Sequence, residues 1–161
     1  MKKGFTMIEL IFVIVILGVL ASVAIPRLAA TRDDAEVAKA ATNLTTAISD
    51  ISAYYTAKGT FSGVSKSNFD KITNALTKKG ELMVKGKTAC VTVGQLPTTV
   101  ASTGSDANKV NITLTFTDSD AVCKTLKTLP GIKAMCGKSG SGETISTTCK
   151  IQVGGSGGIQ F

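Results

Sequence analysis

The sequence lacks histidine and tryptophan, and aromatic residues make up only 5% of its 161 residues. Without histidine, the chain has no histidine general base, no serine–histidine pair and no histidine ligand for a metal. It also has no C-x-x-C pair of a zinc site, and no Gly-Lys-Ser/Thr follows its glycine-rich stretch 137–142, as it would in a phosphate-binding loop. We therefore expect a protein that is not an enzyme and that needs neither a cofactor nor a metal.

Charged residues are also absent from the sixteen positions Leu10–Ile25. Residues 5–25 would span about 31 Å as an α-helix, which matches the roughly 30 Å hydrocarbon core of a bilayer. Lys2 and Lys3 precede this segment and should remain on the cytoplasmic side. The sequence thus predicts a single membrane-spanning helix, with the rest of the chain outside the cytoplasm.

Glu9 is the one charged residue inside this apolar region. A carboxylate near the start of a membrane helix costs roughly 2–3 kcal/mol, so it needs a compensating interaction. The stretch Lys3–Leu10, which reads Lys-Gly-Phe-Thr-Met-Ile-Glu-Leu, resembles the class III signal of type IV pilins and pseudopilins. The resemblance covers residues 1–60, and the remainder is similar only in layout, with a long helix followed by a small head that contains cysteines.

This resemblance implies a role for five residues. A prepilin peptidase would cleave between Gly4 and Phe5 and then methylate the new amino terminus at Phe5. Glu9 would serve assembly by pairing with the freed amine of Phe5, in its own subunit or in a neighbour. Gly18 and Pro26 lie where many family members carry a glycine and a proline that loosen the helix.

The resemblance also implies a function, a location and partners. The chain would wait in the bacterial inner membrane and then polymerise with its own copies into an extracellular or periplasmic filament. A type IV pilus subunit for motility, adhesion or DNA uptake is the first interpretation, and a pseudopilin of a type II secretion or competence system is the alternative. The implied partners are the peptidase, an assembly ATPase and an inner-membrane platform. A remote alternative is a monomeric, membrane-anchored periplasmic binding protein.

Two simpler interpretations of the N-terminus compete with this one. Ser22-Val23-Ala24 fits the small-x-small cleavage site of an ordinary secretory signal, although Glu9 would then lie inside its apolar core. A plain membrane anchor would explain the apolar span but not the order of glycine, phenylalanine and glutamate in the motif.

Beyond the apolar segment, the apolar residues continue at helical spacing. Val37, Ala41, Leu44, Ile48, Ile51 and Tyr55 form one stripe, and Gly59 is a plausible stop. We therefore expect an α+β, pilin-like fold in which a long helix with an apolar first half packs on a small antiparallel sheet with disulfides. The expected parts are a leader at 1–4, a membrane or filament-core helix at 5–25, an amphipathic helix at 26–57 and a β-rich head at 58–161.

Within the head, local patterns predict two short helices and three strands. The helices are expected at 68–79 and 121–129, the second capped by Ser119-Asp120 and ended by Pro130-Gly131. The strands are expected at 88–93, 109–117 and 147–153. Apolar and polar residues alternate along 109–117, which is typical of a half-buried strand. The glycine-rich stretch 154–158 is expected to be loose.

Four cysteines indicate an oxidising compartment, although reduced, buried cysteines remain an alternative. Four cysteines allow three pairings. The loop between Cys136 and Cys149 resembles the C-terminal disulfide-bounded region of type IV pilins, so the resemblance favours this pair and leaves Cys90 with Cys123.

The formal net charge is +7, and loss of Lys2 and Lys3 with the leader would lower it to +5. The head lysines would allow weak binding to nucleic acid or anionic surfaces, but a solvated surface is the simpler explanation. They are Lys78, Lys79, Lys85, Lys87, Lys124, Lys127, Lys133, Lys138 and Lys150. Likewise, Asp33, Asp34 and Glu36 are expected on a solvated face, and Asp118 and Asp120 to cap a helix rather than to bind calcium.

Overall fold

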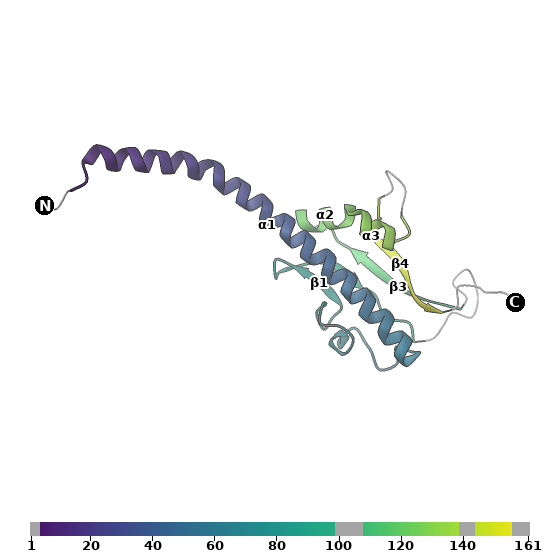
Figure 1. The fold of residues 1–161 in the computed structure, drawn as a ribbon. Helices are drawn as coiled ribbons and strands as arrows, with labels where there is room; N and C mark the ends of the chain where they lie inside the picture. Colours follow the sequence, from purple (N-terminus) through teal and green to yellow (C-terminus); the bar gives the residue numbers. More distant parts are fainter. Residues whose placement is uncertain (1–3, 99–107, 139–143, 156–161) are drawn as a thin grey trace. The chain divides into compact units, whose positions relative to one another are not determined.

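The structure is a computed structural model that describes residues 4–98, 108–138 and 144–155. The chain forms two compact units, residues 1–35 and residues 36–161. A single helix, α1 (Met7–Lys58), contributes to both units (Figure 1). The long N-terminal helix and the small antiparallel sheet with two disulfides confirm the α+β, pilin-like fold.

In the first unit, α1 carries the apolar segment expected from the sequence. An 18-residue window of this helix reaches a mean hydropathy of 2.9, and none of it is buried within the chain. By length and composition the helix can therefore cross a membrane. Gly18 and Pro26 both lie inside the helix, which is assigned without a break from Met7 to Lys58.

In the second unit, α1 buries one face against the sheet. The fully or almost fully buried positions recur every three or four residues and form one stripe, which shares Val37, Leu44 and Ile51 with the predicted stripe. The other predicted members, Ala41, Ile48 and Tyr55, are only partly buried at its edge. The buried positions are Val37, Ala40, Leu44, Ala47 and Ile51. The helix ends at Lys58, and Gly59 follows with φ +67°, a conformation that glycine adopts at little cost. Its N–H donates to the carbonyl of Tyr55 at 2.7 Å, which satisfies one carbonyl of the last turn.

The sheet has four antiparallel strands in the order β1-β2-β3-β4, which is also their order along the chain. They are β1 (Glu81–Val84), β2 (Thr88–Val93), β3 (Lys109–Phe116) and β4 (Thr148–Gly155). Along β3, Val110, Ile112, Leu114 and Phe116 are buried in strict alternation, so one face of the sheet is apolar. Strand β1 was not expected from the sequence, because its four residues are too few for a clear pattern.

Two helices connect β3 to β4, although the sequence analysis predicted only one. Helix α2 (Ala121–Thr128) lies where it was expected. Pro130-Gly131 ends α2 but also begins α3 (Pro130–Met135), with proline in the first turn. Proline is tolerated there because a first-turn residue needs no backbone N–H bond. The proline was therefore interpreted correctly as a stop, and its second role as a start was missed.

The helix predicted at 68–79 is wrong, because only Phe69–Lys71 is helical and forms a single 3-10 turn, η1. Local bonds compete with a longer helix here. The Thr73 hydroxyl bonds the Asp50 carboxylate at 2.7 Å and accepts from the N–H of Ala75 at 3.1 Å. The apolar spacing in this stretch instead reflects core packing, since Phe69 and Leu76 are buried.

The last strand extends to Gly155, so the expectation that Gly154 and Gly155 are loose is wrong. A Cβ on Gly154 would collide with the ring of Tyr55, and Gly155 has φ +91°. These glycines therefore let β4 pass close to α1 and to its partner β3, a role that composition alone did not indicate. Residues 156–158 of the predicted loose stretch lie outside the described residues.

Candidate functional site: the N-terminal segment and the bridged head

The start of α1 holds Glu9 in a local hydrogen-bonded arrangement. The backbone N–H of Thr6 donates to Glu9 Oε2 at 2.9 Å, and the Thr6 hydroxyl donates to the same oxygen at 2.5 Å. Thr6 precedes the first helical residue and Glu9 is the third, which is the spacing of a helix-capping box. This Thr-x-x-Glu signal was not predicted from the sequence, and it gives Glu9 a structural role within its own chain.

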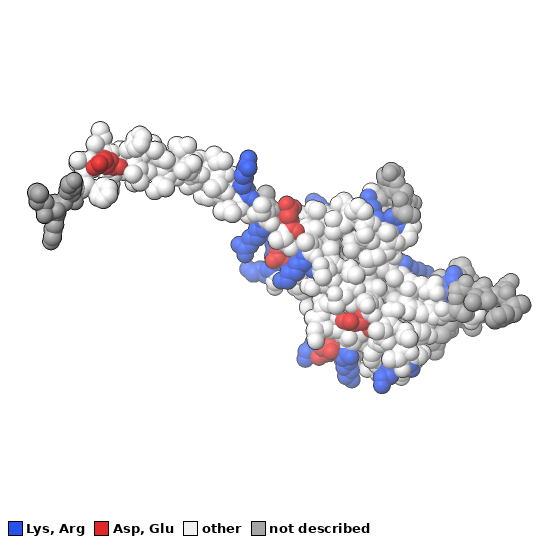
Figure 2. Space-filling model, viewed as in Figure 1, with Lys and Arg blue, Asp and Glu red and all other residues white. Residues whose placement is uncertain are grey.

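The apolar segment that follows Glu9 contacts little of its own chain. Its large hydrophobic side chains are exposed, from 43% for Ile16 to 66% for Phe12 and Ile25. Figure 2 shows that charged atoms are sparse along this first part of α1, whereas Lys, Arg, Asp and Glu recur over the second unit. Such a surface is unfavourable in water, so it requires lipid or other protein chains to cover it.

The two glycines of the first unit, Gly4 and Gly18, both have open space around them. A Cβ built on either would meet no heavy atom within 4 Å. Neither glycine is therefore required for packing inside the chain. Their roles in processing and assembly, and those of Phe5 and Pro26, remain predictions.

Two disulfides connect the head, and they are the pairs that the sequence analysis favours. Cys90 in β2 bonds Cys123 in α2 across 33 positions, and Cys136 after α3 bonds Cys149 in β4 across 13 positions. The first pair is buried, with both cysteines 1% exposed, whereas the second pair is half-buried. The bridges thus attach both connecting helices to the sheet.

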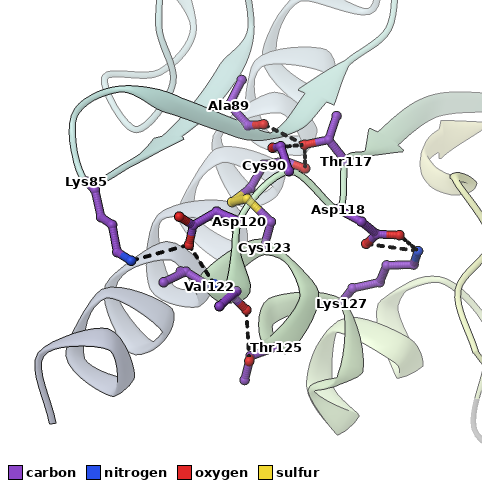
Figure 3. Close-up of a disulfide and its surroundings, with 12 residues drawn as sticks. Lys85, Ala89, Cys90, Thr117, Asp118, Asp120, Val122, Cys123, Thr125 and Lys127 are labelled. Carbon is purple, nitrogen blue, oxygen red and sulfur yellow. Dashed lines mark hydrogen bonds and ion pairs between the residues drawn. A yellow bond between two sulfur atoms is a disulfide. The ribbon is translucent and has the colours of Figure 1, made fainter. Parts of the chain in front are cut away.

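The surroundings of the first disulfide are drawn in Figure 3. Asp120 precedes α2, and its carboxylate accepts from the N–H of Val122 at 2.8 Å and from Lys85 Nζ at 3.4 Å. The Val122 N–H, with a smaller contribution from Lys85, holds the pKa of Asp120 below its ordinary value. Asp118 instead pairs with Lys127 at 3.0 Å. Capping by Asp120 is therefore confirmed.

Lys78 and Glu36, two further charged residues considered in the sequence analysis, each contact a different partner. Lys78 pairs with Asp70 at 3.5 Å, and Glu36 accepts from the backbone N–H of Lys85 at 3.3 Å. Within residues 4–98, 108–138 and 144–155, no three Asp, Glu or Cys side chains are placed to hold a metal ion. Lys2 and Lys3 lie outside the described residues.

Comparison with known proteins identifies a family motif in the first 25 residues of the chain. These residues match the family model of the prokaryotic N-terminal methylation motif. No curated protein and no solved structure matches the chain significantly. The motif is the signal that a prepilin peptidase processes, and together with the exposed apolar helix it fits anchoring in the inner membrane before assembly. The chain therefore carries the class III prepilin signal of type IV pilins and pseudopilins at the start of a pilin-like α+β fold.

Proposed function

We propose that this chain is the structural subunit of a type IV pilus-like filament. The observation that carries the proposal is the pairing of a prepilin signal with an apolar helix that its own chain leaves exposed. Lipid covers such a helix before assembly. After assembly, the same helices from many copies cover one another and form the filament core.

Cleavage of the leader prepares the apolar helix to move from lipid into the filament core. Cleavage between Gly4 and Phe5 removes two lysines and creates a charged amine beside Glu9. In the filament core, this amine pairs with Glu9 of the same or a neighbouring chain and offsets the burial of the carboxylate. The parts 5–25, 26–57 and 58–161 then serve as filament core, stalk and exposed head.

A pseudopilin of a type II secretion or competence system is the second candidate, because it carries the same signal and the same long helix. The bridged C-terminal loop between Cys136 and Cys149 favours the pilus, by resemblance to the disulfide-bounded region of type IV pilins. In either case the assembly ATPase and inner-membrane platform act as partners.

Electron microscopy of cells with and without the gene tests this proposal. We expect long surface filaments that disappear on deletion, return on complementation and bind an antibody against residues 58–161. A cell surface without such filaments, combined with loss of protein secretion on deletion, would favour the pseudopilin. Monomeric processed chain with neither defect would contradict both candidates.

A further inference from the structure

An apolar groove lies in the second unit between α1 and α3. It has a volume of about 430 Å³, and none of its lining residues is charged. Thr42 and Thr45 of α1 form one wall, and Leu129, Gly131 and Met135 belong to the other. The groove therefore differs from the charged positions that recur over the second unit (Figure 2).

The polar atoms on the α1 wall already have partners. The Thr42 hydroxyl donates to the carbonyl of Ala38 at 3.0 Å, and the Thr45 hydroxyl donates to the carbonyl of Ala41 at 2.9 Å. The hydroxyls of these two threonines consequently leave no donor unmet at the groove. An apolar occupant can cover this wall without a buried, unsatisfied donor from either side chain.

The chain itself contains an uncharged, apolar segment that matches the uncharged lining of the groove. Leu10–Ile25 is its long uncharged run, and its large side chains are at least 43% exposed. Gly18 lies in the middle of this run with open space around it, so another surface can approach the helix closely there. A charged surface segment would instead lose hydration in a groove that offers no counter-charge.

We propose that the groove between α1 and α3 binds the Leu10–Ile25 segment of a second copy of this chain. This inference rests on the proposed filament and specifies a surface of the head that holds the apolar helix of a neighbour. It assigns Thr45 and Gly131 to an interface between subunits.

Photo-crosslinking in filaments of the full chain tests the contact directly. Benzoylphenylalanine is placed at Thr45, at Gly131 or at exposed Asn74 as the matched control. Because no Lys or Arg lies between Phe5 and Pro26, trypsin releases residues 5–27 of the processed chain as one peptide. We expect a crosslinked dimer from the first two positions, joined to that peptide, and at least about tenfold less of it from the control position.

Three outcomes would overturn the groove assignment: attachment to a peptide from 28–161, attachment only to another protein or lipid, or no dimer from either groove position. If the unaltered chain forms no filament, the proposed function fails. The same irradiation is then done on the full chain in detergent, where no bilayer holds Leu10–Ile25, and a dimer through residues 5–27 still supports the groove whereas its absence overturns it.

A second experiment introduces a charged side chain at the groove. Thr45→Lys and Gly131→Lys place an ammonium at exposed positions, and no heavy atom lies within 4 Å of a Cβ at Gly131, so the monomer tolerates the change. We expect normal processing and disulfides but about tenfold less filament, because the ammonium loses water on docking. Asn74→Lys should retain filament within about twofold. Equal filament yields from all three variants would contradict the inference.

Discussion

Gly4 has open space around its α-carbon, so a side chain at this position does not disturb the chain itself. A prepilin peptidase, however, must bring the backbone at Gly4 close to its catalytic groups, and a β-branched residue obstructs that approach. We expect Gly4→Val to insert normally into the membrane but to remain uncleaved. Intact-mass measurement of the membrane protein checks this. A Gly4→Val chain that begins at Phe5 or Ile25 would contradict the prediction.

Two roles are assigned to Glu9, a helix cap and a proposed charge partner of the Phe5 amine, and a pair of substitutions separates them. The structure shows local bonds from Thr6, whereas the proposal adds a charge pair with the amine of Phe5. Glu9→Ala removes both interactions, and Glu9→Gln keeps an oxygen that can accept from Thr6 but removes the charge.

If the charge pair drives assembly, both variants should reach the membrane and both should form at least about tenfold less filament. Quantitative blotting of sheared filaments gives the ratio of assembled to membrane-bound chain. Normal filament from Glu9→Gln, with loss only from Glu9→Ala, would show that capping is sufficient. Normal filament from both would remove Glu9 from the assembly mechanism.

Asp120 makes the stability of the head depend on pH. Its folded pKa lies below the ordinary value of 3.8, because the Val122 N–H and Lys85 favour the ionised carboxylate. The linked stability is therefore fully present above pH 3.8 and is lost as the pH falls through the lower, folded pKa. We expect Asp120→Ala to lower the free energy of unfolding at pH 7 and to weaken the acid dependence below pH 4. Urea titrations of the full chain in detergent at both pH values measure this, and an unchanged acid dependence would contradict it.

At the scale of elements, α1 is continuous in the isolated chain, as predicted, although it contains Gly18 and Pro26. Glycine disfavours helix by about 1 kcal/mol relative to alanine, and proline removes one backbone bond, so Val19–Ile25 should be the weakest part of the helix. We expect this stretch to extend when subunits are pulled into a filament. Gly18→Ala meets no neighbour in the chain and should restore helix there.

A cryo-EM map of the filament decides this prediction. Unwound backbone within Val19–Ile25 of the unaltered filament, with more helix in Gly18→Ala, is the expected result. Unbroken helical density through this stretch in the unaltered filament would contradict it.

Elements with a regular and sufficiently long pattern were predictable from the sequence. The alternation along Lys109–Phe116 and the three-and-four spacing of the α1 stripe leave one face apolar, and each pattern fits one kind of element. Asp120 was also predictable as a cap, because its position before an apolar run has a direct physical meaning.

The remaining elements depend on contacts between distant residues. Residues 68–79 have helical spacing, yet Thr73 bonds Asp50, which lies 23 positions earlier, and the stretch packs into the core without a long helix. Strand β1 exists because it pairs with β2, and Gly154 is required because Tyr55 lies against it. The Thr6–Glu9 cap was not predicted, although its Thr-x-x-Glu spacing is present in the sequence.

At the scale of the whole molecule, the head is small and relies on its disulfides. The Cys136–Cys149 bridge closes a short loop and, by the chain-entropy estimate, should contribute about 3 kcal/mol. We expect the double variant Cys136→Ser, Cys149→Ser to lose about this much unfolding free energy while Cys90–Cys123 remains intact. Urea titration with non-reducing peptide mapping measures both. A loss of under about 0.5 kcal/mol would contradict a structural role for this bridge.

The proposed function requires that lipid first covers the apolar helix and that other copies of the chain cover it later. N-terminal peptide mass spectrometry of subunits from purified surface filaments tests this central claim most directly. We predict a terminus at Phe5 that carries a methyl group, with residues 5–27 intact in every assembled subunit. Filaments whose subunits begin at Ile25, and therefore lack the apolar helix, would contradict the account.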